Sequence, residues 1–465
     1  MNCLGLDFGT TSVKAVLYNE ELTQLASYSE EYTLKAAGDR VELEPEKYWQ
    51  LLQNALSAIG KEHQIDCLAI DTQCETLILT DEAGAPLGDA IVWLDNRAAE
   101  EAKLIEAHFG RQKVYEKTGQ PEVTATWPAC KLLWVQRNQP DRWAKVKKVF
   151  LLEDYLLYKL TGQFVTQKTL QSSSLYFDLC SGDWWDEMLE FIGVERAMLP
   201  ALLESAAYVG DYNGTKVVTS AMDQVAGAIG AGVLQEGTVS EMTGTTMVLY
   251  VPTKTFPAYD PQSIIPCHYS FDGNYCLLCW SPTAGMALKW FRDGFLPETD
   301  FAAIDKMAET VPAGCDGLTF LPYLCGSTMP KYNPAARGSF TGLTPEHTPA
   351  HFARSIMEAV ACTLQSNLLH LGLPIREIRV MGGGAKSPLW CRMKADLTGK
   401  TLITLKEKET ACLGSAILAG VGAGAFASVQ EACQKIRTDK EYLPADTDYS
   451  EAYRNFTHYD SLLNK

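Results

Sequence analysis

The chain has 465 residues, 46% of them hydrophobic, and a formal net charge of −17. This length predicts two domains, and the acidic balance argues against binding to nucleic acid or anionic membranes, because no basic surface would attract a polyanion. No leader sequence predicts secretion, and no run of about 18 apolar residues predicts a membrane-spanning helix. We therefore expect a cytoplasmic protein whose 14 cysteines are mostly reduced core thiols.

Strands and helices alternate in the first part of the chain. The residue pattern predicts strands at 2–8, 12–19, 22–34, 65–73, 75–81 and 89–95, and helices at 45–63 and 96–110. The middle, 115–203, is more helical and rich in Trp and Tyr. Residues 217–234 then predict a short strand followed by a helix of small residues.

The pattern begins again after Gly237. Strands are expected at 237–252 and 274–282, a helix at 284–294, and a strand, glycine turn and helix at 377–399. A strand that leads into a Thr/Gly turn thus occurs near residue 10 and again near residue 244. Two similar halves facing a cleft would explain this recurrence, with one domain at 1–236 and the other at 237–465.

The first of these turns lies in "LDFGTTSVK", where Asp7 ends an apolar run. A Gly-Thr-Thr turn between two strands can direct several N–H groups and hydroxyls toward one point, which suits phosphate oxygens. Asp7 beside it could hold a Mg²⁺ ion through water. The alternative is an ordinary hairpin whose threonines satisfy their own backbone.

Two further turns have a similar character. Thr243–Thr246 forms a second hydroxyl-lined turn, and Gly382–Gly384 follows a strand and precedes a helix. Three glycines allow a planar ring or a phosphate to approach the backbone, although a tight strand-to-helix turn is the simpler explanation. The chain has no GxxxxGK[ST] motif and no correctly placed GxGxxG motif, which argues against a P-loop protein and a dinucleotide-binding dehydrogenase.

Asp223 is the only charged residue in "SAMDQVAGAIGAG" and stands between a predicted strand and a predicted helix. It could cap that helix, or accept a proton from a substrate hydroxyl. Further polar residues with one Trp lie at strand ends of the first half and suit a polyhydroxylated ligand; they are Gln73, Glu75, Trp93, Asp95 and Arg97. The alternative is that these residues are polar because they lie at the protein surface, and that Asp95 and Asn96 cap the following helix.

Together these segments resemble the FGGY family of carbohydrate kinases. The resemblance covers nearly the whole chain and includes "GLDFGTTSVKAVL", "AIVWLDNRAAEE", "PACKLLWVQRNQP", "AMDQVAGAIGAG", "TGTTM", "FLPYLCGSTMPKYNPAARGSFTGL" and "MGGGAKSPLWCRMKADLTGK". Within the family the chain is most similar to xylulokinases, with glycerol kinase features in the sugar pocket. The resemblance implies an α/β fold of two actin/hexokinase-like ATPase (ribonuclease H-like) domains facing a central cleft, with ATP and Mg²⁺ as cofactors.

The resemblance also implies roles for individual residues. Asp7 is expected at the Mg²⁺, and Asp223 as the catalytic base with Gln224 near the sugar. The nucleotide is expected to contact Thr10, Thr11, Ser12, Lys14, Gly244, Thr245, Gly285, Lys289, Gly383, Gly384 and Ser387. The implied reaction is direct transfer of the γ-phosphate to a primary hydroxyl, with catalysis by positioning and electrostatics.

The sugar pocket departs from both subfamilies. Cys74-Glu75 stands where xylulokinases have Met-His and glycerol kinases have Arg-Glu, and Ser327-Thr328 replaces part of a "GER" motif common in xylulokinases. Thr126, with Trp127 next to it, falls where glycerol kinases place a Tyr near the substrate. A ketopentose is the expected acceptor, and another ketose, an alditol or a sugar acid are the alternatives. A nucleotide-switched ATPase of the same fold is a rival from another class. The expected partner is a small sugar or polyol, and the chain is expected to form a homodimer.

Overall fold

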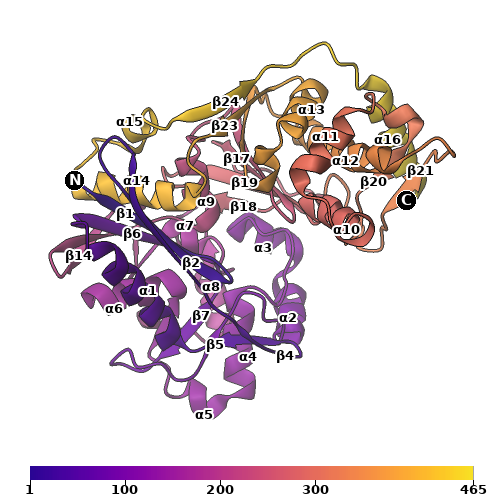
Figure 1. Cartoon of the computed structure of the whole chain (residues 1–465). Helices are drawn as coiled ribbons and strands as arrows, with labels where there is room; N and C mark the ends of the chain where they lie inside the picture. The colour runs from indigo at the N-terminus through magenta and orange to yellow at the C-terminus, as the bar shows by residue number, and fades with distance from the viewer. Residues whose placement is uncertain (464–465) are drawn as a thin grey trace.

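The structure, a computed structural model, describes residues 1–463. Two large mixed β-sheets each form the centre of one half (Figure 1). The order in the first sheet is β14 (Tyr208–Tyr212), β15 (Thr215–Thr219), β6 (Cys67–Thr72), β1 (Cys3–Phe8), β2 (Ser12–Tyr18) and β3 (Gln24–Glu31). In this sheet β1 pairs antiparallel with β2 and parallel with β6.

The second sheet repeats this arrangement. Its order is β18 (Cys267–Tyr269), β19 (Tyr275–Ser281), β17 (Met247–Thr253), β16 (Thr238–Thr243), β22 (Glu377–Met381), β23 (Thr401–Leu405) and β24 (Thr438–Tyr442). In this sheet β16 pairs antiparallel with β17 and parallel with β22, as β1 does with its two neighbours. The two Thr/Gly turns therefore occupy equivalent places, each between the central strand and its antiparallel partner.

Smaller sheets extend the two halves. A five-stranded sheet has the order β4 (Lys35–Ala37), β5 (Arg40–Leu43), β8 (Ala90–Ile91), β7 (Leu77–Thr80) and β9 (Lys148–Leu151). Three two-stranded pairs are β10 (Val165–Gln167) with β13 (Ala201–Leu203), β11 (Phe177–Asp178) with β12 (Asp183–Trp184), and β20 (Thr319–Leu321) with β21 (Ser339–Thr341).

Helices cover these sheets. Before the second sheet they are α1 (Pro45–Gly60), α2 (Ala99–Phe109), α3 (Arg111–Thr118), α4 (Pro128–Asn138), α5 (Pro140–Trp143), α6 (Leu152–Thr161), α7 (Lys168–Gln171), α8 (Asp186–Phe191) and α9 (Asp223–Gly230). Later in the chain they are α10 (Gly285–Phe295), α11 (Phe301–Glu309), α12 (Pro349–Leu371), α13 (Pro388–Thr398), α14 (Thr410–Ala423), α15 (Val429–Cys433) and α16 (Ser450–Leu463). Among residues 1–463, no helix combines the length and the apolar character needed to cross a membrane.

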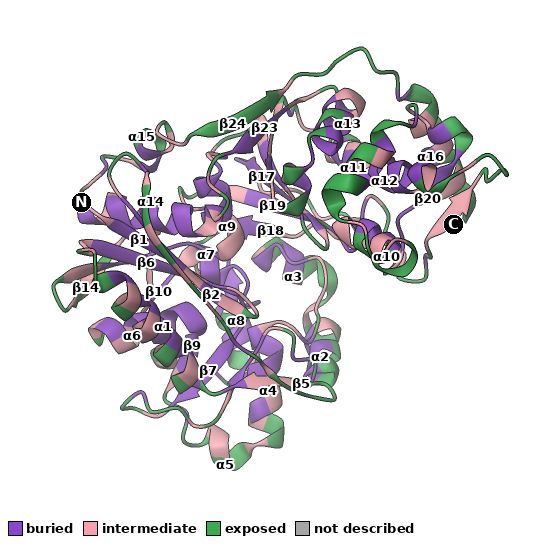
Figure 2. Cartoon of the chain, viewed as in Figure 1, coloured by how far each residue is buried: buried purple, intermediate pink, exposed green. Residues whose placement is uncertain are grey.

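Helix α14 is late in the chain but packs against the first sheet. Figure 1 shows this yellow helix beside the indigo strand β1, and Figure 2 shows that much of it is buried. One hydrophobic cluster includes Cys3 of β1, Ala69 of β6, Ala226 of α9 and Ala416 of α14. The chain therefore returns to the first half after β23 and before it adds the last strand, β24, to the second sheet.

The expected elements are present, with shifted ends. The expected strand at 22–34 ends at Glu31, and the expected helix at 96–110 begins at Ala99. The glycine turn and helix near 383–398 are confirmed. All 14 cysteines are free, as expected, and most are buried. The last strand of the first sheet is β15 and the first of the second is β16, but the domain boundary near residue 236 stays a prediction.

Candidate active site

The first Thr/Gly turn joins β1 to β2 and is fixed by neighbouring side chains. The Tyr32 hydroxyl donates to the Gly9 carbonyl, and Trp93 Nε1 donates to Thr10 Oγ1 at 3.0 Å. Thr11 is exposed, and Ser12 begins β2. The turn therefore offers the hydroxyls of Thr11 and Ser12 at a fixed place.

Lys14 lies on β2 after this turn and is already engaged. Its Nζ is 2.6 Å from Glu409 Oε2, and both side chains are partly exposed. Such a pair contributes little stability, so Lys14 can exchange Glu409 for a phosphate at small cost. The prediction that Lys14 binds phosphate requires this exchange.

Two aspartates lie side by side at the carboxyl ends of β1 and β6. Asp7 is in register with Asp71, and Ser415 Oγ donates to Asp71 Oδ2 at 2.6 Å. Burial, and then the charge of Asp223, raise the pKa of Asp7 to about 6. Burial also raises the pKa of Asp71 well above its usual range. The charges of Asp7 and Asp223 add to the effect of burial on Asp71, and a cation nearby would favour the ionised forms of these carboxyl groups.

A Mg²⁺ ion fits this chemistry. Magnesium is usually held by one or two carboxylates together with water and substrate phosphates. Within residues 1–463, no group of three or more His, Cys, Asp or Glu residues could hold a metal ion. That Asp7 would hold the ion through water, together with phosphate oxygens, stays a prediction.

Asp223 is the first residue of α9, and Met222 occupies the cap position before it. Asp223 therefore does not occupy the N-cap position, although its carboxylate accepts an N–H of the first helical turn. The Gln224 N–H donates to Asp223 Oδ1 at 2.6 Å, and the Cys74 thiol lies 3.7 Å from the same oxygen. Burial raises the pKa of Asp223 to about 6, and the Gln224 N–H opposes this increase. The carboxyl group is thus held at a helix N-terminus with a pKa suited to accepting a proton near neutrality.

The turn after β6 carries the first predicted sugar residues. Gln73 is buried and its Nε2 donates to the Tyr48 hydroxyl at 2.9 Å. Cys74 contacts Asp223, as described above, and Glu75 has a left-handed backbone with φ +60°. Burial raises the pKa of Glu75 to about 8, and Lys131 opposes this increase. This turn therefore brings Cys74 against the candidate base and places Glu75 next to it in the chain.

The segment after β8 carries the other predicted sugar residues, Trp93, Asp95 and Arg97. These residues differ in which groups of the protein they already contact. Trp93 contacts the first phosphate turn through Thr10. Asp95 is fully buried, and the Arg97 guanidinium donates to both of its oxygens and to Glu42. Asp95 and Arg97 are thus engaged with each other, whereas Trp93 links the segment after β8 to the first Thr/Gly turn.

Thr126 and Trp127 precede α4. Trp127 Nε1 donates to the Glu122 carbonyl at 3.0 Å, and Pro128 begins the helix. The described contacts fix the Trp127 ring, but they do not join either residue to Asp223. Their place near the substrate stays a prediction.

The second Thr/Gly turn is packed tightly against α10. The Gly285 N–H donates to the Gly244 carbonyl at 2.9 Å, and the Met286 N–H donates to the Thr245 carbonyl at 3.1 Å. A Cβ atom on Gly285 would lie 2.3 Å from the Gly244 oxygen. This close approach requires glycine at 285, and the contact of Gly285 with the nucleotide stays a prediction.

A fully buried ion pair contacts Thr243, the first residue of this turn. Lys394 Nζ lies 2.9 Å from Glu241 Oε2 and 2.8 Å from Thr243 Oγ1. Lys394 belongs to α13, whereas Glu241 and Thr243 belong to β16. The pair was not anticipated from the sequence, and it ties α13 to the strand that ends in the phosphate turn.

The glycine turn before α13 also meets the second phosphate turn. A Cβ atom added to Gly384 would lie 2.7 Å from Thr243 Cβ, and one added to Gly383 would lie 3.8 Å from the Thr243 carbonyl oxygen. Ser387 Oγ accepts from the Trp390 N–H and caps α13. Lys289 forms an exposed pair with Asp293, 2.5 Å apart. Gly285, Gly383 and Gly384 therefore pack against the second turn, whereas Lys289 is paired on the surface of α10.

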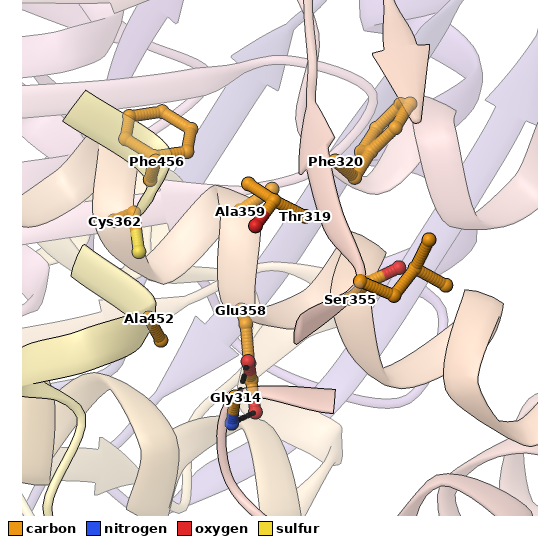
Figure 3. A pocket seen from close by; sticks show the side chains of 10 residues that line it. Gly314, Thr319, Phe320, Ser355, Glu358, Ala359, Cys362, Ala452 and Phe456 are labelled. Carbon is orange, nitrogen blue, oxygen red and sulfur yellow. Dashed lines mark hydrogen bonds between the residues drawn. The ribbon is translucent and has the colours of Figure 1, made fainter. Parts of the chain in front are cut away.

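A small, partly open pocket in the second half is lined by residues other than those of these turns. Figure 3 shows Glu358, Cys362 and Phe456 around it, with Glu358 accepting from the Gly314 N–H. Its volume is about 10 Å³, which is enough for about one water molecule. It is therefore too small for a sugar.

Comparison with known proteins identifies the two halves. The models of the N-terminal and C-terminal domains of the FGGY family of carbohydrate kinases match residues 2–232 and 278–423. Xylulose kinase from Escherichia coli (strain K12) is 29% identical over 95% of this chain and 94% of its own length. Gluconokinase from Bacillus subtilis (strain 168) is 28% identical over 97% and 93%.

A solved structure shares the fold over the full chain. The ligand-bound xylulose kinase from Lactobacillus acidophilus superposes with a TM-score of 0.91 at 25% identity, and covers 100% of this chain and 98% of that one. The expected α/β fold of two actin/hexokinase-like ATPase domains is confirmed. The equivalent positions of the two Thr/Gly turns agree with that fold.

Proposed function

The chain belongs to the FGGY family of carbohydrate kinases, phosphotransferases with a hydroxyl acceptor, and we propose that it phosphorylates a primary hydroxyl of a ketopentose with Asp223 as the base. Kinases of this family use ATP as the phosphate donor. The observation that carries the proposal is the position of Asp223, which heads α9 and lies 3.7 Å from Cys74 of the sugar-side turn. A base there can receive the proton from a hydroxyl bound at that turn.

The proposed roles follow from this arrangement. Asp223 accepts the acceptor's proton as its oxygen attacks the γ-phosphorus in line. Hydroxyls and N–H groups of the two Thr/Gly turns stabilise the charge on the transferring group. A Mg²⁺ ion near Asp7 would supply further positive charge to the phosphates. Trp93 donates a hydrogen bond to Thr10 of the first turn. In the proposed reaction this contact holds the acceptor segment at a fixed distance from the phosphate donor.

Charge favours a neutral acceptor over a sugar acid. The similarity to gluconokinases makes a sugar acid the main alternative. A buried carboxylate needs a cationic or hydrogen-bonding partner. Arg97 is already paired with Asp95 and Glu42, and Lys131 donates to two carbonyls, so both cations are engaged without a substrate carboxylate. A neutral ketopentose therefore fits this set of side chains better.

The test is ADP release from Mg·ATP with D-xylulose, L-xylulose, D-ribulose, L-ribulose, glycerol, erythritol, xylitol, ribitol and gluconate. We expect the highest kcat/KM on a ketopentose. Asp223→Ala should lower kcat by roughly 10²- to 10⁴-fold, the usual contribution of a general base. The exposed Asp141 on α5 offers a control, and Asp141→Ala should leave kcat unchanged. Preference for gluconate would refute the assigned acceptor class, and full activity of Asp223→Ala would refute the base.

A further inference from the structure

Lys131 is a fully buried lysine in α4, and the family resemblance gave it no role. Its ammonium donates to the Glu75 carbonyl at 3.2 Å and to the Val92 carbonyl at 3.0 Å. Burying an ammonium group is costly unless its hydrogen bonds are satisfied. The two hydrogen bonds of Lys131 must therefore offset the cost of burying its charge, and the segments that they join indicate its role.

The two carbonyls belong to different segments of the acceptor side. Glu75 lies in the turn after β6, and Val92 directly precedes Trp93 after β8. Lys131 therefore bridges the two segments that carry the sugar-side residues. Since each carbonyl accepts from the same nitrogen, Lys131 helps to set the distance between the two segments, together with the pairing of Leu77 with Ile91.

The Glu75 end of the bridge is conformationally strained. Its φ of +60° lies in the left-handed region, which residues other than glycine seldom adopt. A carbonyl fixed by a buried ammonium holds the turn in this conformation. The positive charge of Lys131 also opposes the effect of burial on the Glu75 carboxyl.

Both bridged segments reach the reacting groups. Cys74, next to Glu75, lies 3.7 Å from Asp223 Oδ1, and Trp93, next to Val92, donates to Thr10 of the first phosphate turn. A change in the bridge would therefore shift the acceptor relative to both the base and the phosphate. A misplacement of about 1 Å can lower catalysis by about 100-fold.

We propose that Lys131 is a positioning residue of the acceptor site, whose ammonium joins the turn at Glu75 to the segment at Val92–Trp93. It acts through these two carbonyls and not on the reacting atoms. The inference rests on the proposed function, because it assumes that these two segments bind the acceptor. It predicts a defect that is confined to the acceptor and does not extend to the nucleotide.

Lys394 provides a matched comparison, because it is the other fully buried lysine among the described residues. It supports the nucleotide side through Glu241 and Thr243. With Lys131→Met we expect kcat/KM for the acceptor to fall by about 10- to 100-fold, through a lower kcat for the misplaced acceptor together with a higher acceptor KM. The KM for ATP and the slow hydrolysis of ATP without acceptor should not change. Lys394→Met should raise the KM for ATP and leave the acceptor KM nearly unchanged.

Further variants separate positioning from a general loss of folding. Lys131→Gln keeps donor N–H groups, so its acceptor KM should lie between those of wild type and Lys131→Met, and it decides the question if the Met variant is insoluble. Lys103→Met, on the exposed face of α2, should behave as wild type. An unchanged acceptor KM, or equal defects toward acceptor and ATP in both Lys131 variants, would overturn the inference. If the wild type phosphorylates no sugar of the panel, the proposed function fails first, and the inference falls with it.

Discussion

Asp7 and Asp71 lie at the carboxyl ends of β1 and β6, and Asp223 is close enough for its charge to affect both. Burial raises the pKa of all three carboxyl groups. Asp7 and Asp71 are neighbours in register, and the charge of Asp223 adds to the effect of burial on Asp7. With Mg·ATP bound, positive charge would restore the ionised form of Asp7. Burial is the main cause of the raised pKa of Asp223. Because only the ionised carboxylate can accept a proton, the protonation state of Asp223 decides whether the base is available.

We expect kcat/KM for the acceptor to fall as the pH drops through about 6. Burial raises the pKa of Asp223 to about 6, and only the ionised form can accept a proton. Activity is therefore present above this pKa and lost below it. The measurement is kcat/KM at saturating Mg·ATP from about pH 5 to 8, with the residual activity of Asp223→Ala as the control that should lack this dependence. A flat wild-type profile would argue against Asp223 as the ionising base.

The sequence drew attention to the two turns and to Asp223 because each has a local pattern, but the role of Asp223 as the base came from the family resemblance and stays a proposal. A strand followed by Gly-Thr-Thr, or a single acid in a run of small residues, is visible without any tertiary information. Asp71, Lys131 and the Glu241–Lys394 pair were missed for the opposite reason. Their partners lie on elements distant in the chain, and a charged residue in an apolar segment does not reveal what it will contact.

At the scale of elements, α9 and α14 approach so closely that glycine is required. A Cβ atom on Gly414 would lie 1.8 Å from the Ala226 oxygen, and one on Gly230 would lie 1.9 Å from the Thr410 oxygen. Gly5 of β1 meets the Cys412 oxygen in the same way, at 1.7 Å. These three contacts fix α14 against β1 and α9, and α9 carries the candidate base at its first residue.

Gly414→Ala should therefore destabilise the protein. The added methyl group meets backbone, which cannot move aside as a side chain can, and overpacking of this kind costs about 1–3 kcal/mol. The measurement is the thermal midpoint, together with kcat, because displacement of α9 should also move Asp223. Gly60→Ala is the matched control, since nothing lies within 4 Å of its added Cβ and it ends α1. That variant should be as stable as wild type or slightly more stable. Equal midpoints for both variants would contradict this account of the packing.

The whole molecule is not divided as simply as its sequence. The alternation of strands and helices predicted two halves, and both sheets are present. Residues 409–437 lie beyond the second sheet's central strands in the chain but contact the first half. Lys216 Nζ donates to the Ala423 carbonyl, and Lys435 Nζ donates to the Glu20 carbonyl. Contacts between such distant segments leave no local pattern, so the sequence could not place α14.

Residues 1–236 alone should therefore not reach the stability that this half has in the full chain. Without α14 the apolar face formed by β1, β6 and α9 would be exposed to water, and the buried side chains of α14 that cover it include Leu413, Ile417 and Leu418. We expect this fragment to bind a hydrophobic dye and to lose near-UV circular dichroism, as loosely packed states do. The control is the same fragment joined by a flexible linker to residues 406–437, which should unfold cooperatively in urea. If the short fragment unfolds as cooperatively and at the same midpoint as the linked one, then α14 is dispensable to the first half, and the boundary predicted near residue 236 would describe an independent folding unit.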